Sequence, residues 1–153
     1  MIRIAISYHN TRVRIAEAAI KKAVSATCRA LSVSRASFSV VLTSDVEVRK
    51  LNARYRKINK PTDVLSFPVN EKHTGEGEEK YMGEIILGFP YISKQAHIKK
   101  VTVTEEVQML LIHGVLHVHG FDHESDRDEK KMFTLQNKIA QKIGAPLIDP
   151  TKL

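Results

Sequence analysis

The sequence predicts one α+β domain over residues 1–153, in which about five helices pack on a small four-stranded mixed sheet. Three observations support this fold class. Short apolar or alternating segments are typical of strands, and longer segments with apolar residues three or four positions apart are typical of amphipathic helices. The length suits a single domain with its own core, and no repeat or low-complexity segment divides the chain.

The first half of the chain is predicted to contain two strands and two helices. Isoleucine alternates with other residues over residues 2–7, and residues 38–42 are largely apolar, so both segments are predicted to be strands. Between them, apolar residues recur at helical spacing over residues 12–31. A second helix is predicted to begin at the capping-box sequence Ser44-Asp-Val-Glu, with an apolar face formed by Val48, Leu51 and Tyr55.

The second half is predicted to contain two strands and three helices. Residues 64–69 and 82–87 have strand patterns, and the polar residues between them are predicted to form a surface loop. Pro68 suits an edge strand or a strand end, because proline cannot donate to the ladder. The helices are predicted at residues 90–99, at residues 102–119 and from Ser125 to Gly144.

The composition suits a soluble protein of a reducing compartment. A single cysteine, Cys28, excludes an internal disulfide, so a cytoplasmic location is expected. Cys28 lies on the apolar stripe of helix 12–31 and is predicted to be a small core residue, with a catalytic thiol as the alternative. No signal-peptide pattern is found, and no apolar run reaches the roughly 18 residues of a membrane helix, so no membrane partner is expected.

Positive charge is concentrated in the first 60 residues. The net charge is +7, and residues 1–60 contain 13 Lys or Arg against three Asp or Glu. The densest group, with no acid between its members, is Arg49, Lys50, Arg54, Arg56, Lys57 and Lys60. Such a group is either a solvated helix end or a contact surface for a polyanion such as nucleic acid, and we favour phosphate contact.

Four histidines lie within eleven residues, in the segment His113-Gly-Val-Leu-His117-Val-His119-Gly120-Phe-Asp-His123. His113 and His117 are four residues apart, so on a helix they share one face. Gly120 can end that helix in a left-handed conformation, which allows His123 to return to the same point. Three neutral imidazoles with a position open to water are typical of a catalytic zinc site, so one Zn²⁺ per chain is predicted. Such triads also accept nickel, cobalt or iron.

The residues around the triad allow several interpretations. His119 follows His117 by two positions, so it is predicted to point away from the pair and to be exposed or to support a ligand. Asp122 and Glu124 flank His123 and either orient its ring, accept a proton, or are simple charges at a helix start. The spacing matches that of metzincin zinc peptidases, but Gly114 stands where those enzymes have their glutamate base, which disfavours peptide hydrolysis.

The histidine segment resembles the signature of the YbeY family of bacterial endoribonucleases. A second block agrees with the family, in which Leu51-Asn and Tyr55-Arg56 precede Lys60-Pro-Thr-Asp-Val-Leu-Ser-Phe-Pro68. A third, weaker block is Met82-Gly-Glu84-Ile, where the family usually has aspartate in place of Glu84. Because the blocks lie in the family's order, the resemblance covers essentially the whole chain.

The resemblance implies a fold, a site and an activity. The fold is α+β around a zinc cleft, the zinc ligands are His113, His117 and His123, and the essential arginine is Arg56. The activity is cleavage of single-stranded RNA in ribosomal RNA processing, notably at the 3′ end of the small-subunit RNA, and in ribosome quality control. The implied partners are therefore single-stranded RNA, rRNA and ribosomal subunits.

The residues suggest how such a reaction works, but leave alternatives open. The planar guanidinium group of arginine can donate two parallel hydrogen bonds to phosphate oxygens. Arg56 is therefore predicted to hold the scissile phosphate rather than to be one more surface cation. The proton acceptor is zinc-bound hydroxide, Asp122, His119 or a substrate 2′-hydroxyl. Two other functions compete with RNA cleavage: a zinc peptidase, and a non-catalytic ribosome assembly factor with a structural zinc.

Overall fold

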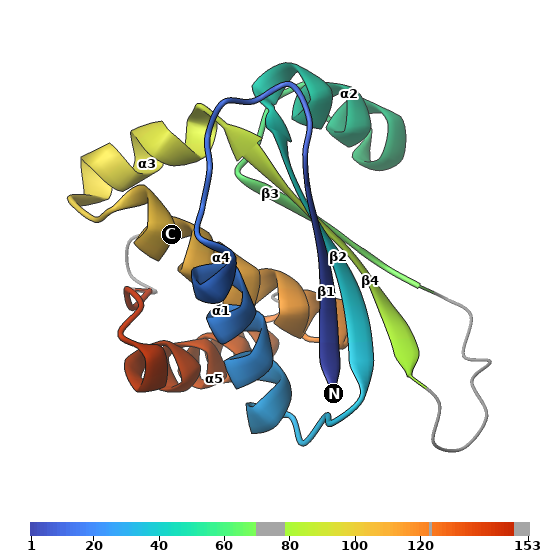
Figure 1. Cartoon of the computed structure of the whole chain (residues 1–153), viewed down its shortest axis with the longest axis vertical. Coiled ribbons are helices and arrows are strands. Elements are labelled where there is room, and N and C mark those ends of the chain that lie inside the picture. The colour runs from blue at the N-terminus through green and yellow to red at the C-terminus, as the bar shows by residue number, and fades with distance from the viewer. Residues whose placement is uncertain (70–78, 123, 149–153) are drawn as a thin grey trace.

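The computed structural model describes residues 1–69, 79–122 and 124–148 (Figure 1). Along these ranges lie four strands and five helices, in the predicted order. They are β1 (Ile2–Tyr8), α1 (Glu17–Ala30), β2 (Ala36–Ser44), α2 (Asp45–Arg56), β3 (Val64–Pro68), β4 (Lys80–Phe89), α3 (Tyr91–Lys99), α4 (Val103–Val118) and α5 (Asp126–Ile143). The α+β prediction is confirmed, whereas the predicted loop between β3 and β4 falls almost wholly outside the described residues.

The four strands form one mixed sheet in the order β1-β2-β4-β3. β1 and β2 are parallel, as are β2 and β4, whereas β3 is antiparallel to β4. β3 is therefore an edge strand, and Pro68 ends it, as predicted. Gly83 pairs with Pro68 and has a φ of +149°, and a Cβ at this position would lie 2.3 Å from the Phe67 carbonyl oxygen. Glycine is required here because no other residue fits.

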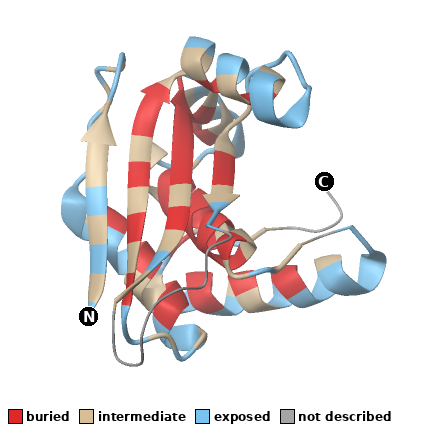
Figure 2. Ribbon diagram, turned by 90° about the vertical axis from the view of Figure 1, so that its right-hand side faces the viewer, coloured by how far each residue is buried: buried red, intermediate tan, exposed pale blue. Residues whose placement is uncertain are grey.

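Helices cover both faces of this sheet. The main core lies between the sheet and α1, α4 and α5, and its sheet residues include Phe38, Val40, Leu42, Ile85 and Leu87. Because side chains alternate along a strand, Ile86 points to the opposite face, where it packs with Val48 of α2 and with Leu65. Figure 2 shows the burial concentrated on the central strands and on the helix behind them.

α4 is the central helix of the main core. It begins at a capping box in which Thr102 and Glu105 exchange two hydrogen bonds of 3.0 Å, and the bond from the Thr102 backbone lowers the pKa of the Glu105 carboxyl. Further along, Gly114 lies against β4, because an added Cβ would be 3.1 Å from the Ile85 Cγ2. This close approach fixes the half of α4 that carries His113 and His117.

α1 begins at Glu17, so the predicted helix over residues 12–31 is wrong at its start. The preceding residues are held in a non-helical path by Tyr8. Its hydroxyl donates to the Ile15 carbonyl at 3.0 Å and accepts from the Ile15 N–H at 3.4 Å, and the Arg14 guanidinium lies 4.4 Å from the ring centroid. These tertiary contacts override a local pattern that has helical spacing.

The interpretation of Cys28 as a core residue is confirmed. Its side chain is fully buried, and burial raises the pKa of the thiol to about 11. A thiol that stays protonated at neutral pH is a poor nucleophile, which contradicts the catalytic alternative. In the part of the chain that the structure describes, no helix is long and apolar enough to cross a membrane.

Candidate metal centre

His113 and His117 form the described part of the candidate site. They lie one turn apart on the C-terminal half of α4, and their ring centroids are 4.7 Å apart with an interplanar angle of 72°. Both side chains are half-buried. The prediction that they share a helix face is confirmed, whereas His123, the third predicted ligand, lies outside the described residues.

The chain turns sharply after the histidine pair, as Gly120 predicts. Gly120 has a φ of +97°, and its N–H donates to the His117 carbonyl at 2.9 Å. The Phe121 N–H donates to the Leu116 carbonyl at 3.1 Å, which closes the end of the helix. Ser125 then caps α5 by accepting from the Asp128 N–H at 3.2 Å, so only a short connection separates the two helices.

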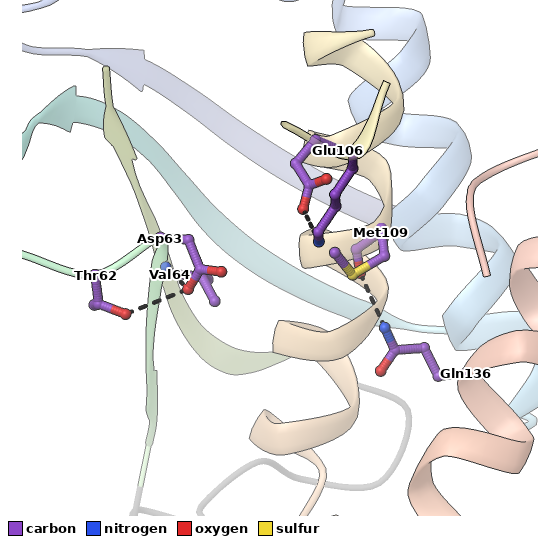
Figure 3. Close-up of polar contacts among 7 residues, drawn as sticks. Thr62, Asp63, Val64, Glu106, Met109 and Gln136 are labelled. Atoms are coloured by element: carbon purple, nitrogen blue, oxygen red, sulfur yellow. Dashed lines mark hydrogen bonds and ion pairs between the residues drawn. The ribbon is translucent and has the colours of Figure 1, made fainter. Parts of the chain in front are cut away.

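Gln136, on α5, fixes the orientation of His113. The glutamine is fully buried, and its Nε2 donates to the Met109 carbonyl of α4 at 3.4 Å (Figure 3). Since that carbonyl can only accept, the amide is oriented with its Oε1 toward His113, where it lies 3.1 Å from Nδ1. With Oε1 as the acceptor, Nδ1 of His113 is the donor, and in a neutral ring this tautomer places the lone pair on Nε2, as in a ligating histidine.

The donor chemistry of this pair fits zinc. Neutral imidazole is a common zinc ligand, and a hydrogen bond from the second ring nitrogen to a protein oxygen is the usual support for a ligating histidine. Within residues 1–69, 79–122 and 124–148, no three His, Cys, Asp or Glu side chains are grouped so as to hold a metal. A three-ligand site therefore requires a contribution from outside these ranges, where His123 lies.

Arg56 ends α2 and reaches the edge of the sheet. Its Nη2 donates to the Ser66 carbonyl of β3 at 3.2 Å, while the side chain stays exposed. The helix ends here because Lys57 has a left-handed conformation, and Asn52 holds the following loop by donating to the Lys60 carbonyl at 2.9 Å. One N–H of the guanidinium is used within the fold, and the others can bind an anion.

A family model described as Endoribonuclease YbeY matches residues 4–144. The chain belongs to the YbeY family. Relatives named Endoribonuclease YbeY include one from Persephonella marina, 38% identical over 125 residues with 81% of each chain covered, and one from Aquifex aeolicus, 39% identical over 119 residues with 77% of each chain covered. A solution structure from Thermotoga maritima matches with a TM-score of 0.61 at 27% identity, over 94% of this chain and 89% of that one.

In this YbeY-family chain, the histidines and Arg56 belong to different layers. His113 and His117 are on α4, which packs in the main core, whereas Arg56 is on α2, which packs on the opposite face. β3 lies next to both groups. The carbonyl of Ser66 accepts a hydrogen bond from Arg56, and Val64, the first residue of β3, lines the same cleft as His113. His113 and Arg56 therefore both lie near this edge strand, although no direct contact between the two is found among the described residues.

The structure confirms the predicted direction of His119 and decides against one of its two predicted roles. Its Nδ1 bonds to the Val115 carbonyl at 2.8 Å, and its ring lies 6.0 Å from that of Phe38 on β2. The ring therefore points away from the pair, as predicted. Of the two predicted roles, solvent exposure does not hold, because the side chain is half-buried and its Nε2 is buried, with no hydrogen-bond partner among the described residues. Support of a metal ligand by His119 stays a prediction.

The remaining predicted residues are exposed, except for Asp122. Asp122 is half-buried and its Oδ1 accepts from the N–H of the exposed Glu124 at 3.3 Å, which shapes the turn before α5. Their roles beside His123 stay predictions. The predicted RNA-binding residues are all exposed, as contact with a polyanion requires: Arg49, Lys50, Arg54, Lys57 and Lys60.

Sequence reasoning missed Gln136 and a cleft of about 880 Å³ that borders His113. The signal for Gln136 was a polar residue within the buried stripe of α5, between Met132 and Ile139. The cleft is lined by Val64 of β3, by Asp63 just before it, and by residues of α3, α4, α5 and the segment after Gly144. At its α3 side, the Lys99 Nζ lies 2.7 Å from a carboxylate oxygen of the fully buried Glu106.

Proposed function

We propose that this chain is a zinc-dependent endoribonuclease that cleaves single-stranded RNA in the cytoplasm. Its work is ribosomal RNA processing, notably at the 3′ end of the small-subunit RNA, and ribosome quality control, with rRNA and ribosomal subunits as partners. The observation that supports this most is the paired His113 and His117, with His113 held by Gln136 in the form that can bind a metal. Relatives named Endoribonuclease YbeY supply the substrate class.

His113, His117 and His123 would hold one zinc ion per chain. Bound zinc acts as a Lewis acid and lowers the pKa of bound water to about 7. On the protein side, Gln136 orients His113, and Gly120 turns the chain in a left-handed conformation three residues before His123 in the sequence. Arg56 binds the scissile phosphate through the N–H groups not used by Ser66, and its fixed charge stabilises the charge that develops on the phosphate oxygens.

The peptidase alternative is opposed by the position of Gly114. This residue is buried against β4, and an added Cβ would already be 3.1 Å from the Ile85 side chain. A glutamate in its place would meet the sheet rather than the histidine pair. The metzincin arrangement, in which a base follows the first histidine, is therefore disfavoured by packing as well as by residue type.

The experiment that tests the proposed function compares substrates and metal states. Purified protein is incubated with single-stranded RNA, duplex RNA and an unstructured protein, before and after metal removal by a chelator. We expect single-stranded RNA alone to be cleaved, loss of cleavage on chelation, and recovery with added zinc. Cleavage of the unstructured protein would indicate the peptidase, and RNA binding without cleavage by the zinc-loaded protein would indicate the assembly factor.

Replacing Gln136 with leucine is expected to weaken zinc binding by about 10- to 100-fold, the usual effect of removing the hydrogen-bond partner of a ligating histidine. His113 then loses the acceptor that keeps its proton on Nδ1. Competition with a chromogenic chelator measures the zinc affinity. Gln108→Leu is the matched control, because Gln108 is also buried on a helix of the core but donates to the Ala19 carbonyl at 3.1 Å. Equal zinc affinity in the two variants would contradict the role of Gln136.

A further inference from the structure

Tyr55 is an exposed aromatic residue within the most basic segment of the chain. The sequence places it on the apolar face of α2 with Val48 and Leu51, but the three residues differ in burial. Val48 is fully buried, whereas 56% of the Tyr55 surface is accessible to solvent. The reason is its position in the last turn of the helix, where the small core beneath α2 has ended.

The ring of Tyr55 is exposed but held in place. It meets the ring of Phe67 on β3 edge-on, with centroids 5.3 Å apart and an interplanar angle of 63°. The Arg54 guanidinium carbon lies 5.2 Å from the Tyr55 centroid. Phe67 itself packs against the core under α2, so Tyr55 has a fixed support. A large, preoriented aromatic surface in contact with water is what a stacking partner requires.

Tyr55 and Arg56 contact consecutive residues of the same edge strand. Tyr55 packs on Phe67, and Arg56 donates to the carbonyl of Ser66. The ring and the guanidinium are therefore neighbours along β3. The same segment carries five more exposed cations and no acidic residue between positions 49 and 60, although Lys50 pairs with Glu47 at 3.6 Å: Arg49, Lys50, Arg54, Lys57 and Lys60.

We propose that Tyr55, supported by Phe67 and flanked by Arg54, is a stacking site for a base of single-stranded RNA next to the phosphate bound by Arg56. Proteins that bind single strands combine a basic groove with aromatic side chains on which bases stack. The excess of cations in this segment favours a polyanion over a protein partner, and only an unpaired strand exposes the face of a base. The proposal rests on the proposed function, because RNA is the ligand.

Binding measurements on the full chain test the stacking site. The probe is a fluorescein-labelled 2′-O-methyl RNA single strand, checked by gel for integrity, and its affinity is measured by anisotropy. Tyr55→Leu is expected to weaken binding by about 5- to 100-fold, whereas Tyr55→Phe keeps the wild-type affinity. The salt dependence of binding is expected to stay unchanged in Tyr55→Leu, because no phosphate contact is removed.

Two further measurements separate stacking from a general loss of affinity. In the first, probes that each lack one base are compared. At one position of the strand, loss of the base should weaken binding to the wild-type protein but not to Tyr55→Leu. The chain contains no tryptophan, so Tyr55→Trp introduces a single tryptophan that can be excited selectively. Its emission should be quenched by single-stranded RNA and not by duplex RNA.

A matched control uses a second exposed tyrosine. Tyr81 is 42% exposed on β4, and its hydroxyl donates to Ser39 Oγ at 2.9 Å. Tyr81→Leu is expected to bind the probe as the wild type does. If the wild type binds and cleaves RNA but Tyr55→Leu has unchanged affinity, the stacking site is overturned while the proposed function stands, and Tyr55 becomes a candidate contact for a protein. If the wild type neither binds nor cleaves RNA, both are overturned.

Discussion

Replacing Arg56 with alanine is expected to lower the rate of RNA cleavage by about 10²- to 10³-fold, the effect of removing one preorganised donor from developing charge. The zinc content is expected to stay at the wild-type level, because Arg56 lies on α2 and bonds to β3, not to the histidines. Single-turnover cleavage and metal analysis by mass spectrometry, carried out on the same preparation, measure the two quantities. Cleavage at the wild-type rate would remove Arg56 from the mechanism.

Two companion variants make this result specific. Arg56→Lys keeps the positive charge but not the planar fork, so its cleavage rate is expected to fall between those of the wild type and Arg56→Ala. Arg29 is an exposed arginine in the last turn of α1, as Arg56 is in the last turn of α2. Arg29→Ala is therefore expected to cleave RNA normally. Equal losses in Arg29→Ala and Arg56→Ala would indicate a general effect of net charge.

β3 is the element that links the parts of the proposed site. It is short and pairs only with β4 in the described sheet, so the backbone groups on its other side remain available to other elements. Arg56 uses one of them, the Ser66 carbonyl. Asp63 precedes the strand, accepts the Val64 N–H at 2.7 Å, and lines the same cleft as His113. A strand of RNA that follows this edge would meet Tyr55, Arg56 and then the cleft.

The fold was predictable because most of its elements carry local signals. The capping sequences at Ser44, Thr102 and Ser125 each lie next to the first residue of a helix, and Gly144 ends the last helix in a left-handed conformation. The apolar patterns locate all four strands. The start of α1 was not predictable, because the preceding residues are held by Tyr8 from outside the helix.

The site was predictable only where it depends on spacing along one helix. His113 and His117 share a face because they are four residues apart, and helix geometry guarantees this. Gln136 meets His113 only through the packing of α5 on α4, and the exposure of Tyr55 depends on where the core beneath α2 ends. The apolar pattern of one segment does not show which distant segment will pack against it, so such contacts cannot be predicted from it.

Replacing His117 with alanine is expected to remove zinc and to lower RNA cleavage on the order of 10³-fold, since a metal contributes several kcal/mol to charge stabilisation in the transition state. The domain is expected to stay folded, because His117 is only half-buried while its neighbours Val115 and Leu116 supply the packing of this turn. Metal analysis, RNA cleavage and thermal unfolding are measured together. His97→Ala, on the exposed last turn of α3, is the matched histidine control.

The combination of results for His117→Ala separates a catalytic zinc from a structural one. A catalytic zinc with an open coordination position leaves the fold intact when it is lost, whereas a structural zinc contributes its binding free energy directly to folding. The core around α4 argues for the first case, since it is built from fully buried aliphatic side chains such as Leu111 and Ile112. A cooperative thermal transition near that of the wild type, with RNA still bound but not cleaved, is therefore the expected result. Loss of that transition together with the zinc would assign the metal to the fold.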